Sequence, residues 1–210
     1  SGASESNNTA IQGFAYSKRR QGKHIISTCL EHSSVSGTLT FLQEQGYEID
    51  LVSIQEDGTV DLEELKQLLR EDTILVTICA VDSELGVIQP IEKIAEITHK
   101  YGAVLIVDEA HGAHFRISDK LPTPAYKLGA DLVIESVHKT LPSMTQTAVL
   151  HKCGNRVKEE EVEKSLGIYQ SSSPSYVLMA SIDRCIDVIE NYGDNFMGKL
   201  LIALNNFRSN

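Results

Sequence analysis

The chain lacks the features that would place it in a membrane or on nucleic acid. No apolar run approaches the roughly 20 residues that a membrane-spanning helix needs. The formal net charge is −10, and Lys and Arg cluster only at residues 18–20. A phosphate backbone is bound by clustered positive charge, which is missing here. These absences exclude a membrane span and argue against a nucleic-acid partner.

The cysteines also lack the spacing that would give them a structural role. The four of them, at positions 29, 79, 153 and 185, lie far apart, whereas zinc sites use closely spaced pairs. No secretory leader precedes them, so we predict a reducing, cytoplasmic location. The chain begins at Ser1 rather than Met, and this start predicts a piece trimmed from something longer.

What is present is a regular alternation of two apolar patterns. The length of 210 residues suits one substantial domain over residues 1–210, with a composition typical of globular proteins. Strands are predicted at residues 24–29, 48–54, 73–80, 103–107, 131–134 and 148–151, the last of them antiparallel. Helices are predicted at residues 4–16, 35–45, 61–70, 91–101, 159–167, 176–191 and 196–207. This alternation predicts an α/β fold with a mostly parallel sheet inside a three-layer α/β/α sandwich.

Polar residues follow several of these strands, where ligands gather in parallel sheets. His32 follows the first strand, Ser83 the third, Asp108 and His111 the fourth, and Lys139 the fifth. A lysine at the rim of a sheet is poorly solvated, and a carboxylate after a purely apolar strand needs a donor partner. Two simpler readings stay open: Lys139 as a surface lysine in a loop, and Asp108 as the cap of a turn.

Together these residues suit an aldehyde cofactor that carries a phosphate and a pyridine ring. Lys139 supplies an amine for an imine, Asp108 an acid for the ring nitrogen, and His32 a flat group over the ring. The small-residue helix start at Ala3 and Ser4 offers free N–H groups to an anion, and Ser136 and His138 complete that cradle.

Two sets of motifs then resemble known families. Residues 2–8, 23–26, 31–32 and 82–91 (GASESNN, KHII, EH and DSELGVIQPI) are similar to cysteine desulfurases of the pyridoxal-phosphate fold type I superfamily. Residues 107–115, 128–131, 136–142 and 171–176 (VDEAHGAHF, LGAD, SVHKTLP and SSSPSY) resemble the ornithine/lysine/arginine decarboxylases of the same superfamily. The change of family predicts an engineered chimera of two homologous half-domains, residues 1–105 and 106–210.

The resemblance implies a pyridoxal 5′-phosphate-binding large domain whose Lys139 carries the cofactor as a Schiff base. It implies that Asp108 pairs with the ring nitrogen, that His32 stacks on the ring, and that Ala3, Ser4, Ser136 and His138 lie at the phosphate. In the decarboxylases the serine-rich turn reaches a neighbouring subunit's phosphate. Ser171 and Ser172 therefore imply a homodimer with shared sites. The family resemblance also implies an amino acid or amine as substrate.

Departures from the desulfurase pattern bear on activity. Ser83 stands where desulfurases usually carry an asparagine near the phenolic oxygen, and His111 stands where they carry a glutamine. None of the four cysteines matches the desulfurase nucleophile, and we expect the chain to lack the small domain that holds the substrate carboxylate in that family. Because loss of orientation costs several orders of magnitude in rate, we expect weak or no turnover.

Three alternatives remain open from the sequence. The chain could be an active decarboxylase or a desulfurase-type enzyme. Asp108, His111 and His114 could hold a divalent metal if their segment were helical, although no metal site is the favoured reading. The chain could also be a ligand-free piece made to test folding.

Overall fold

The computed structural model describes residues 2–209, and its six strands form one sheet in the order β2-β1-β3-β4-β5-β6. Neighbouring strands are parallel throughout, except that β6 runs antiparallel to β5. The mostly parallel sheet and the antiparallel last strand are both confirmed. The strands are β1 His24–Ser27, β2 Glu48–Leu51, β3 Thr73–Cys79, β4 Val104–Asp108, β5 Leu132–Glu135 and β6 Val149–Lys152.

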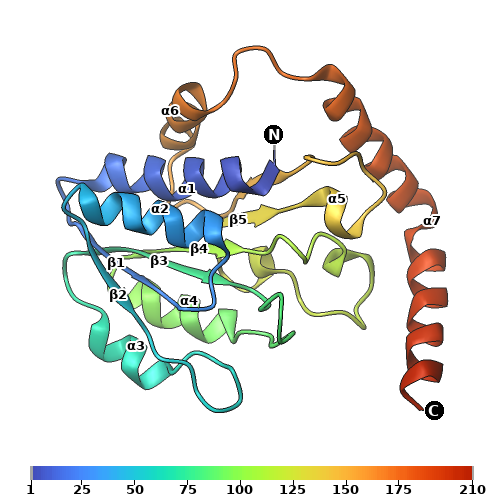
Figure 1. Ribbon diagram of the computed structural model, residues 1–210, viewed down its shortest axis with the longest axis horizontal. Coiled ribbons are helices and arrows are strands. Elements are labelled where there is room, and N and C mark those ends of the chain that lie inside the picture. Colours follow the sequence, from blue (N-terminus) through green and yellow to red (C-terminus); the bar gives the residue numbers. More distant parts are fainter. Residues whose placement is uncertain (1, 210) are drawn as a thin grey trace.

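Helices cover both faces of this sheet. Figure 1 shows α1 and α2 on one side and α3 and α4 on the other, with α7 beyond the edge. The three-layer sandwich is therefore confirmed. The helices are α1 Gly2–Lys18, α2 Ser33–Glu44, α3 Leu62–Leu68, α4 Ile91–Lys100, α5 Val137–Thr140, α6 Glu159–Tyr169 and α7 Tyr176–Arg208, with short 3₁₀ turns η1 Phe115–Ile117 and η2 Ala125–Lys127.

The core consists of two apolar layers, one on each face of the sheet. Val104 and Ile106 of β4 pack in the layer under α1 and α2. Leu105 and Val107 of the same strand pack in the layer under α3 and α4. Because successive side chains of a strand point to opposite faces, Asp108 faces the layer under α1 and α2, and Glu109 faces the layer under α3 and α4. The pleat of β4 therefore sends two neighbouring carboxyl groups to different sides of the sheet.

The C-terminal region differs from the sequence prediction. The sequence predicts two helices, at residues 176–191 and 196–207, whereas the structure has the single helix α7. The segment between them contains no proline, and a glycine costs a helix only about 1 kcal/mol. Gly193 is buried, and a Cβ there would lie 3.1 Å from Ile117 Cγ2. The glycine thus lets α7 approach η1 without ending the helix.

Other boundaries shift by a few residues. The strand predicted at 48–54 ends at Leu51, and Ile54 forms only an isolated bridge with Val60. The two end residues of the predicted domain, at positions 1 and 210, lie outside the described residues. Among residues 2–209, no helix has both the length and the apolar character needed to cross a membrane.

Candidate functional site

A cavity of about 250 Å³ opens at the carboxyl ends of the central strands, beside the first turn of α1. Nine residues that the sequence predicts for the site line it together: Ala3, Ser4, His32, Ser83, Asp108, His111, Ser136, His138 and Lys139. Two do not, because Ser171 and Ser172 lie exposed in the turn between α6 and α7. The predicted strand-end residues therefore share one rim, and the role predicted for the serine-rich turn, at the phosphate of a neighbouring subunit, stays a prediction.

Asp108, at the end of β4, forms the floor of the cavity. Its side chain is 7 % exposed, so its oxygens need donors within the protein. Oδ2 accepts a hydrogen bond from Asn7 Nδ2 at 2.8 Å, and Oδ1 accepts one from the Ala110 backbone N–H at 2.9 Å. Each carboxyl oxygen is held by one N–H group, which fixes the plane of the carboxylate.

His32 stands at the other side of the floor, as the residue that caps α2. Its Nδ1 accepts the Ser34 backbone N–H at 3.1 Å and lies 2.8 Å from Ser34 Oγ. This bond satisfies one of the free N–H groups at the start of α2. The imidazole is thereby held at the cavity by the helix itself.

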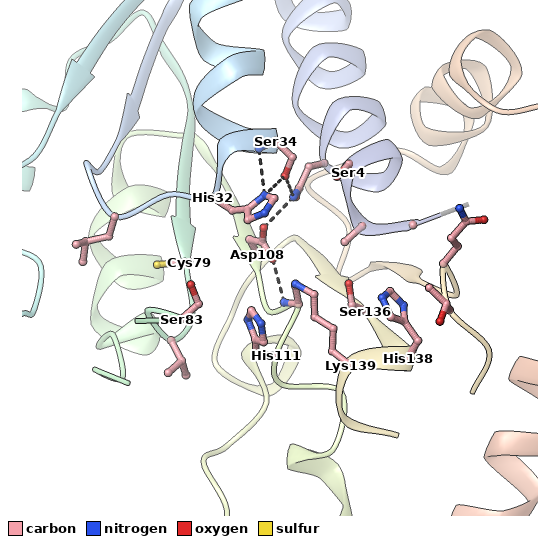
Figure 2. Close-up of a pocket in the computed structure, with 18 residues that line it drawn as sticks. Ser4, His32, Ser34, Cys79, Ser83, Asp108, His111, Ser136, His138 and Lys139 are labelled. Carbon is pink, nitrogen blue, oxygen red and sulfur yellow. Dashed lines mark hydrogen bonds between the residues drawn. The ribbon is translucent and has the colours of Figure 1, made fainter. Parts of the chain in front are cut away.

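Lys139 reaches the cavity from the opposite wall. It lies on α5, a single turn that follows β5 and is anchored by the buried Val137. Figure 2 shows the Lys139 side chain extending toward Asp108, with His32 and His111 nearby. Lys139 therefore does not belong to an unstructured surface loop, and its amine faces the groups that the sequence predicts around it.

Ser136 and the start of α1 form a polar corner of the cavity. Ser136 is 1 % exposed, and its Oγ has no hydrogen-bond partner among the described residues. The Gly2 N–H donates to Gln146 O at 2.6 Å, which ties the helix start to the segment after α5. His138 Nδ1 donates to Thr147 O at 2.9 Å. A helix N-terminus beside an unpartnered buried hydroxyl suits an anion.

A second, partly buried carboxyl group belongs to Glu31, which lies in the chain between the lining residues Leu30 and His32. Glu31 Oε1 accepts hydrogen bonds from the Cys79 backbone N–H and Thr28 Oγ, both at 2.9 Å, while Oε2 has no partner among residues 2–209. Burial raises the pKa of Glu31 to about 7. Burial also raises the pKa of the Cys79 thiol, with Glu31 and Asp108 adding to the effect.

The alternative metal site is wrong for the described part of the chain. No group of three His, Cys, Asp or Glu side chains within it could hold a metal ion. His111 lines the cavity, where burial and then Lys139 lower its pKa. Burial also lowers the pKa of His114, and the charge that acts on it is that of Glu135, on the other face of the sheet. Their segment is a turn rather than a helix, so the spacing does not bring the three side chains together.

Sequence reasoning missed several lining residues, among them Asn7, Ser34, Thr145 and Gln146. Asn7 lies one helical turn after Ser4, and this spacing places it on the same face of α1. Ser34 follows His32 at the position where a helix cap finds its donor. Gln146 has a left-handed backbone, with φ of 77°, and nothing in the sequence signals it.

The sheet topology and this cavity define a class, the pyridoxal-phosphate proteins of fold type I. Residues 1–151 match the family model described as aminotransferase class-V, and the chain belongs to that family. Class-V aminotransferases and cysteine desulfurases depend on pyridoxal 5′-phosphate, so this is the cofactor of the family.

Individual relatives support the assignment. The chain is 40 % identical to a cysteine desulfurase IscS of Neisseria meningitidis over 139 residues, which are 66 % of this chain and 33 % of the relative. It superimposes on DndA from Streptomyces lividans with a TM-score of 0.73 at 25 % identity, covering 91 % of this chain and 55 % of that one. A NifS-like protein gives a TM-score of 0.72 at 24 % identity over 99 % of this chain and 58 % of that one, and shows the fold alone.

The chain spans about a third of the length of the curated relatives that it matches. The family match continues across residues 102–108, where the sequence analysis places a junction between two families. Neither the decarboxylase-like second half nor the chimera gains support from these comparisons. Both stay predictions.

Proposed function

We propose that this chain is a pyridoxal 5′-phosphate-binding large domain in which Lys139 holds the cofactor through its amine. One observation carries the proposal. Lys139, Asp108 and His32, which come from three separate elements, converge on one cavity of about 250 Å³ beside the unpartnered hydroxyl of Ser136. A surface lysine or a turn-capping aspartate would not require that convergence.

The residues that line the cavity fit pyridoxal 5′-phosphate. The phosphate would lie at the start of α1, where Ala3 and Ser4 offer backbone N–H groups, within reach of Ser136 Oγ and His138. The dipole of the 17-residue helix α1 favours a negative charge at that end. A phosphate oxygen would also give Ser136 Oγ the hydrogen-bond partner that it lacks among residues 2–209.

Asp108 and His32 would serve the ring. When bound, the cofactor supplies an electron sink for negative charge at the α-carbon of an amino acid. Asp108, fixed by Asn7 and Ala110, would hold a proton on the ring nitrogen, and His32 would lie against the face of the ring. Ser83 would lie near the phenolic oxygen of the ring, and His111 would line the same cavity.

Turnover is the weaker part of the proposal. Cys79 is the one cysteine among those lining the described cavity, and burial raises its pKa, so the thiol stays protonated at neutral pH. A thiol is a much poorer nucleophile than a thiolate. We therefore propose binding with weak or no turnover. An active amino-acid decarboxylase or cysteine desulfurase is the alternative, because the matched relatives are cysteine desulfurases.

We further propose that the chain forms a homodimer in the cytoplasm. Support for the dimer comes from the family resemblance of Ser171 and Ser172, and from the finding that both are exposed and do not line the cavity of their own chain. An amino acid or amine would be the substrate. The mass of the protein in solution, measured by light scattering, tests the dimer directly, and a monomer at every concentration would exclude shared sites.

Absorption spectroscopy tests cofactor attachment. Added pyridoxal 5′-phosphate should give the absorption band of an imine, and borohydride reduction followed by peptide mapping should find the cofactor on Lys139. Lys139→Ala should abolish the band, whereas Lys152→Ala, an exposed lysine on β6, should keep it. A colourless protein, or a cofactor fixed to another lysine, would refute the proposal.

Product analysis separates the binding domain from the two enzymes. The loaded protein is incubated with ornithine, lysine, arginine or cysteine in the presence of a thiol reductant, which releases persulfide sulfur as sulfide, and carbon dioxide and sulfide are measured. Sulfide would favour the desulfurase, and carbon dioxide would support the decarboxylase-like second half. No product from a protein that retains the imine band is the result that we expect.

A further inference from the structure

A chain of hydrogen bonds links the two groups that face the cofactor ring. Asn7 Nδ2 donates to Asp108 Oδ2 at 2.8 Å and to Ser34 Oγ at 3.0 Å. Ser34 Oγ in turn lies 2.8 Å from His32 Nδ1. Figure 2 shows this chain running from Asp108 to Ser34 and His32 at the top of the cavity. Asn7 is 1 % exposed, so solvent does not compete for its amide.

The direction of each bond follows from its chemistry. An amide N–H can only donate, so Ser34 Oγ accepts from Asn7 and has its own proton free to give. The Ser34 backbone N–H also points at His32 Nδ1, at 3.1 Å, and it too can only donate. His32 Nδ1 therefore receives two donors and must carry a lone pair. In the neutral ring the proton then lies on Nε2.

We propose that Ser34 and Asn7 are positioning residues that lock His32 as the Nε2–H tautomer and make it a hydrogen-bond donor to the cavity rather than a carrier of protons. The proposal rests on the proposed function, because it assigns a role to His32 over the ring. A base at Nε2 would need a free lone pair there, and the tautomer that has one would turn an Nδ1 proton against the Ser34 N–H. An acid at Nε2 would leave an anionic imidazole behind.

This assignment limits which groups can move a proton above the ring. His32 keeps its proton while it contacts the ring face or a substrate oxygen. Proton transfer to or from a substrate then falls to another group that lines the cavity, of which Lys139 is the one with an amine. The same bonds couple His32 to Asp108 through Asn7, so a shift of α1 would displace both groups together.

Nitrogen NMR of the cofactor-free chain, with ¹⁵N-labelled histidine, tests the tautomer. The chain has seven histidines, and His32→Asn assigns the resonance of interest while keeping a residue that caps α2 well. We expect an unprotonated Nδ1 and a protonated Nε2. Each donor is worth roughly a fivefold shift in the ratio of the two tautomers. Ser34→Ala should therefore lower that ratio about fivefold and move the Nδ1 resonance.

Ser36→Ala is the matched control, because Ser36 is exposed on the same helix; it should leave both resonances unchanged. A protonated Nδ1 in the unmodified chain, or a Ser34→Ala spectrum identical to that of the parent, would overturn the assignment. Neither measurement needs bound cofactor. If the chain fails to take up pyridoxal phosphate yet shows the Nε2–H tautomer, the proposed function fails and the tautomer assignment stands. If the chain takes up the cofactor and His32 is protonated on Nδ1, the tautomer assignment fails and the proposed function stands.

Discussion

Asp108 and Glu109 are neighbours at the end of β4, but their carboxyl groups meet opposite surroundings. Asp108 faces the cavity, and an N–H group donates to each of its oxygens. Glu109 faces the other layer, where Oε1 accepts from the Ala125 N–H at 2.9 Å and Oε2 has no donor in the described chain. Burial, with Glu135 adding to it, raises the pKa of Glu109 to about 8.

Burial alone does not distinguish these two carboxyl groups, since Asp108 is 7 % exposed and Glu109 is 3 % exposed. Their surroundings differ in the number of hydrogen-bond donors and in the charge of the neighbouring groups. Asp108 has an amide on each oxygen, whereas Glu109 shares its surroundings with Glu135, whose Oε2 already lies 3.1 Å from His151 Nε2. A fully donated carboxylate can serve as a fixed charge for a ligand. A carboxyl group in which only one oxygen accepts a hydrogen bond is better suited to be a neutral acid.

Asp108→Asn is expected to have the largest effect, and it acts on the cavity side. An asparagine has only one oxygen, so either Asn7 Nδ2 or the Ala110 N–H would face an NH₂ group. Hydrogen bonds to charged groups are worth about 1.5–3 kcal/mol, so the affinity for pyridoxal phosphate should fall roughly 10- to 100-fold. A spectroscopic titration measures it. Glu109→Gln should leave that affinity unchanged, and equal losses in the two variants would break the comparison.

Glu109→Gln should instead raise stability at alkaline pH. The pKa of Glu109 is raised from 4.5 to about 8 in the folded chain, so the folded state binds more protons than the unfolded state in that interval. The free energy of unfolding of the parent should therefore fall as pH rises from about 5 to about 8. The amide of glutamine mimics the neutral acid and should remove roughly 1–3 kcal/mol of that loss at pH 8.

Urea denaturation of the Glu109→Gln variant and its parent at pH 5 and pH 8 measures this difference. Glu163→Gln changes an exposed carboxylate on α6 and serves as the control, with no expected change at either pH. A parent protein that is equally stable at both pH values would argue that Glu109 is ionised without penalty.

Glu31→Gln sharpens the comparison, with a smaller expected effect. Glu31 lies next to the lining residue His32 in the chain and feels the charge of Asp108, but both of its donors reach the same oxygen. Its pKa is raised from 4.5 to about 7, so stability should be lost as pH rises from about 5 to about 7. The variant should recover about 1 kcal/mol at pH 8. If the variant recovers no stability, the ionisation of a carboxyl group is decided by the side of the sheet on which it lies, and not by which of its oxygens have donors.

The sequence predicts much of this arrangement, for reasons that are local. The unbroken apolar run before Asp108 and the polar residues after each strand are visible without a structure, and the topology rule brings them to one rim. The continuous α7 was missed because glycine is a weak signal, and its packing on Ile117 decides the outcome. Asn7 and Ser34 were missed because their roles depend on contacts with residues far away in the chain.

The neutral acid at Glu109 could not be foreseen either. The alternation of β4 predicts which face it occupies, but the approach of Glu135 depends on the register between β4 and β5, in which Asp108 pairs with Ile134. Such pairings are fixed by tertiary packing rather than by local preference. The position of a carboxyl group at a strand end is therefore easier to predict from the sequence than whether that group is ionised.

The hydrogen bond from the Gly2 N–H to Gln146 O has a consequence for how the protein folds. It joins the first turn of the chain to the segment before β6, so the corner at Ser136 is complete only when almost the whole sheet is in place. Contacts of such long sequence separation form slowly, because chain entropy is lost before they are made. The corner at Ser136 should thus be among the last parts of the cavity to become ordered, and a nascent chain that ends before Gln146 cannot yet complete it.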